Sequence, residues 1–480
     1  MRRTKIIATL GPATDKEGML ERLFDAGVDV FRLNYSHQTH KHHEQRVKKI
    51  RELSLQLKRA VGVIADLQGP KIRIEHFNEG KVQLREGATF TIDTDLPENG
   101  GNEKHVGVSY KNLPRDVRAG DTLLVDDGRI VLRVKDVQNH EVGCEVIAGG
   151  ELSDNKGINL QGGGLSADTL TEKDKLDLNH AVKIGADFIA VSFPRCVDDI
   201  HMARKILDEL DSPARIIAKI ERAEALDNID TIIEASDAIM IARGDLGVEI
   251  GDARLPPVQK HLIELARTRD RAVITATQMM ESMIDHQMPT RAEVFDVANA
   301  VLDGTDAVML SAETSIGNYP EKAVLSMSRI CEETEKQRSI RVSDHRIDQR
   351  FEKIDETIAM STMYAANHIG AKAIAALTET GSTCLWMSRI SSGMPIFAFT
   401  QHSTTRRRVS LYRGVYPVKF DITHTDPLQA NKQIIDELMT MNIVAKGDYV
   451  IITKGDLYGR RGGTNNMKII RVGESIEHEI

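Results

Sequence analysis

Short apolar runs, each followed by a segment with helical periodicity, recur along the chain. The segment that begins at Thr171 opens with a capping-box pattern to Asp174 and ends at Gly185, and a later helical segment ends at Gly304. Strands that alternate with helices indicate a parallel sheet. Eight such units predict an α/β fold, a closed (β/α)8 TIM barrel with its active site at the carboxyl ends of the strands. The eight runs are KIIATLGP, VFRLNYSH, VGVIADLQGP, FIAVSFPR, RIIAKIER, AIMIARGDLG, AVITATQMM and AVMLSAET.

Two regions depart from this alternation and predict two further domains. Residues 71–168 read as all-β, with an Asp-Gly hairpin signal at Asp127 and Gly128. Because this domain is inserted at the catalytic end, we expect it to act as a lid. From residue 346 a second α/β pattern begins, with strands expected in AKAIAAL, PIFAFT and DYVIITKG. The predicted domains are the catalytic barrel (1–70 and 169–345), the inserted β-barrel-like lid (71–168) and a C-terminal α/β regulatory domain (346–480).

Polar residues follow the apolar runs at one end. In RIIAKIERAEAL, Lys219 and Glu221 stand two residues apart, so they point to the same side of the strand. For one strand alone, two solvated charges at a strand end would explain them. If the strand ends were independent and solvated, polar residues would not be expected at the same end of nearly every unit. The pattern therefore favours a shared catalytic mouth. The other residues at these ends are Arg32, Asn34, Ser36, Asp66, Asp245, Thr277, Ser311 and Glu313.

The composition is that of a globular protein with no nucleic-acid or membrane partner. Of 480 residues 41% are hydrophobic and 28% are charged, and the formal net charge of -8 argues against bulk binding to nucleic acid or to a membrane. No run approaches the roughly 20 apolar residues of a bilayer span, and the opening segment does not have the pattern of a signal peptide. The four cysteines lie far apart without a Cys-x-x-Cys pair, which is typical of buried reduced thiols in a cytoplasmic protein.

Two carboxylates at the predicted mouth are candidates for a metal site. Glu221 and Asp245, near the ends of adjacent strands, are placed to share a divalent cation such as Mg²⁺, which prefers oxygen ligands. Carboxylates in surface ion pairs are the alternative. Arg32 and Lys219 then supply positive charge that suits a phosphoryl group or a carboxylate, as phosphoryl transfer or enolate chemistry requires. The chain has neither a P-loop nor a G-x-G-x-x-G motif, so a nucleotide must bind by another route.

The tract HQTHKHHE contains four histidines and has the appearance of a metal tract. The spacing of these histidines does not distinguish a metal-binding pair on one face of a helix from an ordinary polar surface. A solvated start of a helix is therefore favoured. His37 alone, beside Ser36 at the strand end, is expected to reach the site.

The motifs LNYSH, DLQGPKIR, AKIE, ARGDLGVE, ATQMMESMI, PTRAEV and DGTDAVMLSAET occur in this order along the chain. Together they resemble the pyruvate kinase family, with the inserted domain in the same place and the likeness covering essentially the whole chain. The resemblance implies transfer of phosphoryl from phosphoenolpyruvate to ADP, which gives pyruvate and ATP. It also implies a homotetramer.

The resemblance implies a role for each matching residue. Lys219 corresponds to the residue that stabilises the phosphoryl group in flight, and Glu221 and Asp245 to the ligands of Mg²⁺, for which Mn²⁺ can substitute. The backbone N–H groups of Gly244 and Asp245, with the Thr277 hydroxyl, would hold the substrate carboxylate. The remaining roles go to Thr277, Ser311 and Glu313 (water-assisted proton path), Arg32, Arg73 and Lys156 (nucleotide phosphates, with Lys156 on the lid), and Asn34, Ser36, Asp66 and the Leu67 carbonyl (monovalent-cation site).

Two further expectations concern regulation. Family members that need K⁺ have Gly-Pro-Glu-Ile-Arg where this chain has GPKIR, and Lys71 reverses the charge, so its ammonium can supply what K⁺ otherwise brings. We therefore expect no K⁺ requirement, the alternative being a lysine turned to solvent at the lid hinge. The stretch LTETGST resembles the family's loop for an effector phosphate, through Thr378, Thr380, Gly381, Ser382 and Thr383, the alternative being an ordinary helix cap.

Two other functions are compatible with these residues. A different metal-dependent enolate enzyme on the same barrel, such as an aldolase or a phosphoenolpyruvate mutase-like enzyme, would explain the metal and Lys219 but not the lid or Lys156. A non-catalytic metabolite sensor would be expected to have lost at least one of Arg32, Lys219, Glu221 and Asp245, and all four are present.

Overall fold

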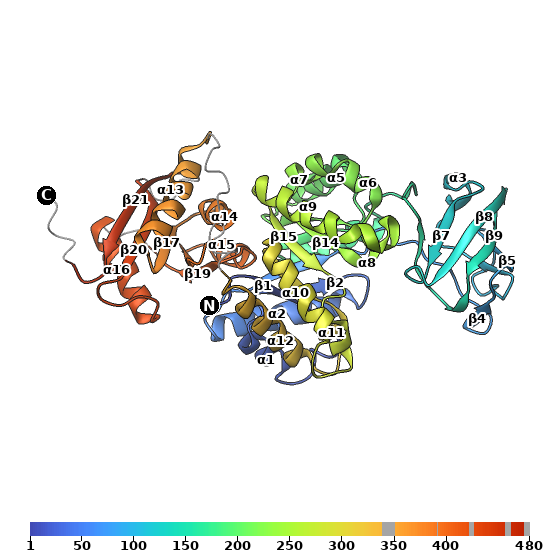
Figure 1. Ribbon diagram of the computed structural model, residues 1–480, viewed down its shortest axis with the longest axis horizontal. Coiled ribbons are helices and arrows are strands. Elements are labelled where there is room, and N and C mark those ends of the chain that lie inside the picture. The colour runs from blue at the N-terminus through green and yellow to red at the C-terminus, as the bar shows by residue number, and fades with distance from the viewer. Residues whose placement is uncertain (338–350, 391, 422–426, 457–461, 475–480) are drawn as a thin grey trace.

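Three bodies lie in a row in the computed structural model (Figure 1). The barrel occupies the middle, the β-rich insertion lies at one end and the C-terminal α/β body at the other. The structure describes residues 1–337, 351–390, 392–421, 427–456 and 462–474. The boundary expected at residue 346 lies outside these ranges.

Eight parallel strands close the barrel, and they are the eight that the apolar runs predict. The order around the barrel is β1-β16-β15-β14-β13-β12-β3-β2, with β2 and β3 in a register that pairs Asn34 with Asp66. The TIM-barrel prediction is therefore confirmed. The strands are β1 (Lys5–Thr9), β2 (Val30–Asn34), β3 (Gly62–Asp66), β12 (Phe188–Val191), β13 (Arg215–Ile220), β14 (Ala238–Ala242), β15 (Ala272–Ala276) and β16 (Ala307–Leu310).

Helices follow the barrel strands and begin and end where the sequence signals lie. The capping box of Thr171 and Asp174 opens α4, and Thr290 with Glu293 forms a second box at the start of α10, which ends at Gly304 with φ 93°. The α-helices of the barrel are α1 (Met19–Ala26), α2 (His40–Gln56), α4 (Glu172–Lys183), α5 (Val197–Glu209), α6 (Ala223–Asp227), α7 (Ile229–Ala235), α8 (Arg243–Ile250), α9 (Leu255–Thr268), α10 (Arg291–Asp303), α11 (Ala312–Ser315) and α12 (Pro320–Thr334), with the short 3-10 helices η1 (Asp252–Arg254) and η2 (Glu281–Ile284).

The period of two along the strands divides the hydrophobic core of the barrel into two layers. Ile216 and Ala218 of β13 pack outward among the helices, whereas Ile217 belongs to the inner cluster. That inner cluster continues into the C-terminal domain through Met363 and Met387. The barrel floor and the C-terminal domain therefore share one core, and the polar mouth is left at the opposite end of the strands.

The insertion is an almost purely β structure, as its sequence predicts. Its main sheet has the order β11-β7-β8-β9-β5-β6, and a separate pair joins β10 to β4. Asp127 and Gly128 lie in the loop between the antiparallel strands β7 and β8, which confirms the hairpin. The elements are β4 (Lys81–Leu84), β5 (Thr89–Asp93), β6 (His105–Gly107), α3 (Leu113–Asp116), β7 (Thr122–Val125), β8 (Ile130–Gln138), β9 (Glu141–Ala148), β10 (Gly150–Ser153) and β11 (Ile158–Leu160).

The C-terminal body contains a five-stranded sheet of order β19-β18-β17-β20-β21. The three strands expected from sequence are β17, β18 and β20. Sequence analysis missed β19, whose VYPVK contains a proline, and β21, whose TNNMKIIR begins with polar residues. The elements are α13 (Ile354–Ile369), β17 (Ala373–Leu377), α14 (Ser382–Arg389), β18 (Ile396–Thr400), α15 (Ser403–Val409), β19 (Val415–Lys419), α16 (Pro427–Thr440), β20 (Tyr449–Gly455) and β21 (Thr464–Arg471).

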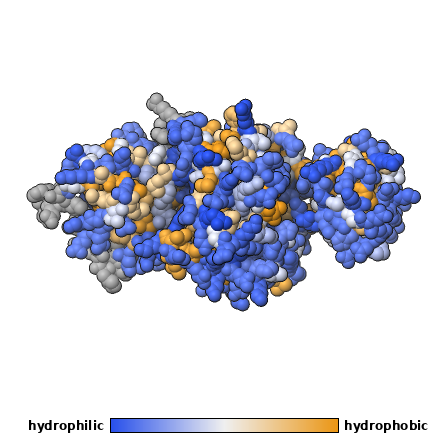
Figure 2. Space-filling model, turned by 90° about the horizontal axis from the view of Figure 1, so that it is seen from below, coloured by the Kyte–Doolittle hydropathy of each residue, from blue (hydrophilic) through white to orange (hydrophobic). Residues whose placement is uncertain are grey.

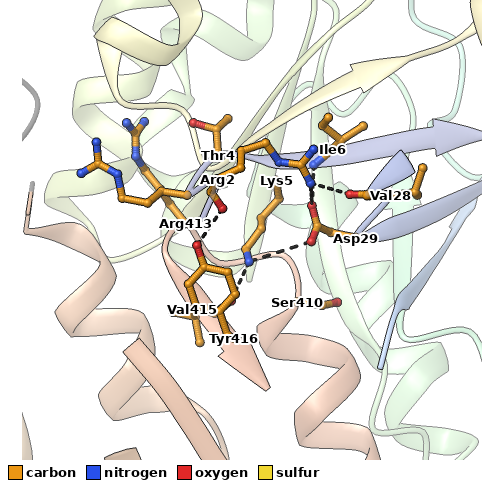
Figure 3. A network of polar contacts seen from close by, with 12 residues as sticks. Arg2, Thr4, Lys5, Ile6, Val28, Asp29, Ser410, Arg413, Val415 and Tyr416 are labelled. Atoms are coloured by element: carbon orange, nitrogen blue, oxygen red, sulfur yellow. Dashed lines mark hydrogen bonds and ion pairs between the residues drawn. The ribbon is translucent and has the colours of Figure 1, made fainter. Parts of the chain in front are cut away.

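A buried polar network joins the barrel floor to the C-terminal domain (Figure 3). Lys5, the first residue of β1, donates to the Val415 carbonyl at 2.6 Å, and its ammonium lies 4.4 Å from the centre of the Tyr416 ring. Asp29 lies 4.0 Å from the same ammonium and pairs with Arg2 at 2.5 Å. The N-terminal end of the barrel is therefore held by charged groups as well as by apolar packing.

The surface differs among the three bodies (Figure 2). The insertion is a separate globule covered largely by hydrophilic residues, and hydrophobic residues gather over the C-terminal domain and where it meets the barrel. Within the described ranges, no helix combines the length and the apolar composition of a membrane span.

Candidate active site

The residues predicted for the catalytic mouth lie at the carboxyl ends of the barrel strands. Arg32 and Asn34 belong to β2, Asp66 ends β3 and Lys219 is the penultimate residue of β13. The others come directly after a strand or in the helix that follows it: Ser36, Glu221, Gly244, Asp245, Thr277, Ser311 and Glu313. One end of the barrel therefore gathers nearly all of the polar residues that the sequence singled out.

Lys219 and Glu221 form a buried ion pair. The Lys219 ammonium lies 2.9 Å from Glu221 Oε1 and 3.2 Å from Asp66 Oδ1. The two residues are only 9% and 2% exposed, so the interpretation of two solvated charges at a strand end is wrong. Burial disfavours the charged ammonium, but Asp66 and Glu221 outweigh it and raise the pKa of Lys219. Lys219 is therefore held as a cation inside the mouth.

Asp66 joins this lysine to Arg32. The Arg32 guanidinium donates to Asp66 Oδ2 at 2.5 Å and to the Thr9 hydroxyl at 3.1 Å. Burial opposes ionisation of Asp66, but the charges of Arg32 and Lys219 prevail and lower its pKa. One buried carboxylate therefore fixes two cations side by side, as a doubly charged anionic substrate requires.

Glu221 and Asp245 lie near each other, and a lysine is paired with each. Burial, and then the charge of Asp245, raise the pKa of Glu221 against the opposing effect of Lys219. Asp245 pairs with Lys71 at 2.9 Å. Lys71 is therefore turned into the mouth, and the interpretation of a lysine facing solvent at the lid hinge is wrong.

Gly244, which follows β14, contacts Thr277, which follows β15. The Gly244 N–H donates to Thr277 Oγ1 at 2.8 Å, and that hydroxyl donates to the Ala276 carbonyl at 2.6 Å. Thr277 has φ 64°, a left-handed conformation that is rare for a β-branched residue and is typical of functional sites. Helix α8 begins beside it, so the N-terminus of a helix and a threonine hydroxyl lie together at the mouth.

Ser311 and Glu313 end the eighth unit in different environments. Glu313 accepts from the backbone N–H of Ser311 at 2.6 Å and of Met280 at 3.2 Å, and burial raises the pKa of its carboxyl group. Ser311 Oγ is buried and has no hydrogen-bond partner within the described part of the chain. A buried orphan hydroxyl is costly unless a ligand or water satisfies it, so Ser311 is the better placed of the two to contact a substrate.

The predicted nucleotide contacts are only partly assembled. Partial burial, then the charges of Arg73 and Arg32, lower the pKa of His37. Arg73 also donates to the Asn155 carbonyl at 2.8 Å. Lys156 pairs with Asp126 of its own domain at 2.8 Å, so the structure does not bring it to the mouth.

The residues of the expected monovalent-cation site use their oxygens locally. Asn34 Oδ1 accepts from the Ser36 backbone N–H at 3.1 Å, and the Leu67 carbonyl accepts from the Ser192 hydroxyl at 2.7 Å. Asp66 is occupied by Arg32 and Lys219. The pairing of β2 with β3 places Asn34 opposite Asp66, and Ser36 and Leu67 follow the ends of these two strands.

The loop expected to hold an effector phosphate does open a helix. Gly381, with φ 87°, precedes α14, and its N–H donates to Thr378 Oγ1 at 2.9 Å. The hydroxyls of Thr380 and Ser382 lie 2.9 Å apart. Thr383 is buried, and its hydroxyl lies 3.0 Å from that of Thr464. All five residues therefore already make hydrogen-bond contacts within the C-terminal domain.

Two residues of the mouth were missed by the sequence analysis. The Ser192 hydroxyl accepts from Lys219 at 2.7 Å, and the backbone N–H of Phe193 donates to Glu221 Oε2 at 2.8 Å. Both follow the apolar run FIAV, and the only signal was that the fourth unit, like the first, had no polar residue assigned to its end. The histidine tract was also partly misjudged: α2 does begin there, but His43 is buried and stacks on Tyr35 at 4.4 Å between ring centres.

A closed (β/α)8 barrel with paired lysine and arginine cations, two neighbouring carboxylates and a helix N-terminus at its mouth is typical of enzymes that act on anionic substrates. Comparison with known proteins gives the family. The family model for the barrel domain of pyruvate kinase matches residues 1–324, and that for its alpha/beta domain matches residues 356–470. The chain therefore belongs to the pyruvate kinase family and is an enzyme of that kind, which excludes an aldolase or a mutase-like enzyme.

Similar proteins match over nearly the full length. Pyruvate kinase II of Salmonella typhimurium is 53% identical over 476 residues, which cover 98% of this chain and 99% of the relative. A pyruvate kinase of Corynebacterium glutamicum is 42% identical over 474 residues, 98% of each chain. A crystal structure of a pyruvate kinase from Cryptosporidium parvum has a TM-score of 0.92 at 35% identity and covers 98% of this chain and 96% of that one.

Proposed function

We propose that the chain transfers phosphoryl from phosphoenolpyruvate to ADP, giving pyruvate and ATP. The observation that carries this is the junction at Asp66, which holds the Lys219 ammonium and the Arg32 guanidinium in one buried group. Phosphoryl in transit needs charge compensation more than covalent help, and Lys219, kept protonated by its carboxylates, supplies it. The N–H groups at Gly244 and Asp245, with Thr277, would hold the substrate carboxylate.

The mouth is then completed by a proton path and a lid. Ser311, with its unpartnered hydroxyl, and Thr277 would orient the water that protonates the enolate, while Glu313 holds the backbone around Ser311. Residues 71–168 would act as the lid that brings Arg73 and Lys156 to the nucleotide phosphates, once Lys156 releases Asp126.

Glu221 and Asp245 fit a divalent cation. Their oxygens are ligands of the kind that Mg²⁺ or Mn²⁺ prefers, and each is now paired with a lysine ammonium, as expected of carboxylates that face a cation site. Asp245 raises the pKa of Glu221, which places the two carboxylates within electrostatic reach. A bound Mg²⁺ would supply charge compensation for the substrate oxygens.

The test is a coupled assay of pyruvate formation from phosphoenolpyruvate and ADP with Mg²⁺. We expect turnover that requires all three. No turnover in the presence of the metal and both substrates would contradict the proposal and would favour a metabolite sensor.

The expected independence from K⁺ is part of the proposal. The Lys71 ammonium lies in the mouth, 2.9 Å from Asp245, so a positive charge is already present there. Activity with tetramethylammonium as the only monovalent cation should stay within about tenfold of activity in K⁺, about 1.4 kcal/mol in barrier. Lys71→Glu should create a K⁺ requirement. A parent enzyme nearly inactive until K⁺ is added, at saturating substrates and matched ionic strength, would overturn this part.

The proposal also includes activation by a phosphorylated metabolite. The effector loop begins α14, and the last residue of that helix, Arg389, forms a buried ion pair with Asp306, the residue before β16. A ligand at one end of α14 would thus act on a helix anchored to the barrel. Replacement of Thr378, Thr380, Ser382 and Thr383 by alanine should abolish activation by whichever sugar phosphate or nucleotide activates the parent, while Ser403→Ala with Thr404→Ala should not. Unchanged activation in the fourfold variant would place the site elsewhere.

A homotetramer in the cytoplasm completes the proposal. Large apolar side chains are exposed on two faces, Phe295 (70%) on α10 and Ile354 (71%) and Tyr364 (61%) on α13, as expected of surfaces that a second copy covers. All four cysteines are free, which agrees with a reducing compartment. Light scattering should give four times the mass of the chain; a monomer at micromolar concentration would contradict the assembly.

A further inference from the structure

Ser192 lies at the centre of the mouth, although no predicted role involves it. It follows β12 directly and is 1% exposed. Its hydroxyl donates to the Leu67 carbonyl at 2.7 Å and accepts from the Lys219 ammonium at 2.7 Å. Because a hydroxyl has one hydrogen and two lone pairs, the bond to Leu67 turns a lone pair toward Lys219. The orientation of the hydroxyl is therefore determined by the backbone after β3.

Three oxygens surround the Lys219 ammonium. It donates to Ser192 Oγ at 2.7 Å and forms ion pairs with Glu221 Oε1 at 2.9 Å and Asp66 Oδ1 at 3.2 Å. The two carboxylates keep the ammonium charged, but both also interact with other groups, Glu221 with Phe193 and Asp66 with Arg32. Ser192 makes the shortest contact and adds no charge, so it directs the ammonium without reducing its electrostatic effect.

The backbone around Ser192 is tightly constrained. Phe193 has φ 56°, and its N–H holds Glu221. Gly69 of the neighbouring loop approaches so closely that a Cβ there would lie 2.8 Å from the Ser192 Cβ. A side chain on such a backbone has little freedom to move, so the hydroxyl is a fixed reference point for the lysine.

We propose that Ser192 is a positioning residue for phosphoryl transfer: it holds the Lys219 ammonium in the direction in which the migrating phosphoryl group needs it. This rests on the proposed function of Lys219. Ser192 acts through that lysine, so its loss should slow the chemical step and leave metal and substrate binding nearly unchanged.

The test is Ser192→Ala, with Ser192→Cys as a variant that fills the same space but carries a much weaker acceptor. In both, kcat should fall about 10- to 100-fold, the effect typical of groups that orient an active-site residue, while KM for phosphoenolpyruvate stays within about threefold. Binding of Mn²⁺ to the substrate-free enzyme, followed by the electron paramagnetic resonance of free Mn²⁺, should stay within about twofold, because Glu221 keeps the Phe193 N–H.

Two controls decide whether the effect passes through Lys219. Ser236→Ala removes another buried barrel hydroxyl, one that donates to the Ile232 carbonyl at 2.7 Å, and should leave kcat unchanged. In a Lys219→Met background, Ser192→Ala should cost less than about twofold, because residues that act as a unit are not additive.

The outcomes separate the two proposals. If Lys219→Met keeps its kcat, the role of Lys219 itself fails. If Lys219→Met is impaired but Ser192→Ala and Ser192→Cys stay within about twofold of the parent, or if Ser192→Ala has its full effect in the Lys219→Met background, Ser192 does not position the lysine. Should Ser192→Ala fail to fold, the kcat and Mn²⁺ binding of Ser192→Cys decide alone.

Discussion

The barrel contains two buried lysines at its opposite ends, and they differ in what surrounds them. Lys5 lies at the floor, held by the Val415 carbonyl, the Tyr416 ring and a carboxylate 4.0 Å away (Figure 3). Lys219 lies at the mouth, with two carboxylates at 2.9 Å and 3.2 Å. Burial lowers the pKa of Lys5 to about 8, whereas Asp66 and Glu221 overcome burial and raise the pKa of Lys219.

The comparison teaches that burial alone does not make a catalytic cation. At the floor, Asp29 is shared with Arg2 and Arg59, so little of its charge is left to offset the desolvation of Lys5. At the mouth, Asp66 is likewise shared with Arg32, but Glu221 places a second carboxylate beside Lys219. The floor lysine therefore serves packing between domains, and the mouth lysine is maintained as a charge.

The largest expected effect comes from removing each ammonium. Lys219→Met should lower kcat by about 10³-fold or more, because the charge matters most while phosphoryl is in transit. Metal binding should survive, measured with Mn²⁺ and no substrate. Lys5→Met, at the other end of the barrel, should leave kcat within about threefold in the same coupled assay. A Lys219→Met enzyme that kept most of its kcat would remove the functional contrast between the two lysines.

A smaller effect is expected from neutralising the partner carboxylates. Asp66→Asn should lower kcat about 10- to 100-fold, since it frees both Arg32 and Lys219 from their shared anchor. Asp29→Asn is the matched control at the floor, where Arg2, Lys5 and Arg59 surround the carboxylate, and its effect should appear in the melting temperature with little change in kcat. Equal losses of kcat in the two variants would show that Asp66 acts only on stability.

The smallest effect separates the lysines by the sign of their pH dependence. Lys5 is protonated in both the folded and the unfolded state below about pH 8, so its contribution is constant there. Between about pH 8 and 10.5 the unfolded state binds more protons, so stability should rise with pH, by about 1–3 kcal/mol relative to Lys5→Met. The measurement is the difference in melting temperature between parent and variant across this window.

For Lys219 the sign is opposite. Its raised pKa makes the folded state bind more protons above pH 10.5, so its stabilising contribution is complete below that pH and is lost above it. The difference between the parent and Lys219→Met should therefore stay constant from pH 8 to 10. A difference that grows with pH, as expected for Lys5, would be inconsistent with the two carboxylates acting on Lys219.

Periodicity and local signals were sufficient for most of the fold. The eight barrel strands, the capping box at Thr171, the stop at Gly304 and the Asp127–Gly128 hairpin depend on neighbouring residues, and each is present. The strands β19 and β21 were missed because a proline and a polar start hide their patterns, and only pairing with β18 and β20 stabilises them.

For the active site, the sequence by itself determined most of the residues that end the barrel strands at the mouth, because a strand period of two and the barrel rule place side chains without knowledge of contacts. Only the tertiary structure decided how those residues are paired. Ser192 meets Lys219 across 27 residues and Lys71 meets Asp245 across 174, and no local pattern encodes such contacts. Burial and charge at a point in space depend on every chain segment that converges there, and for that reason two lysines of the same type are a structural group at Lys5 and a maintained cation at Lys219.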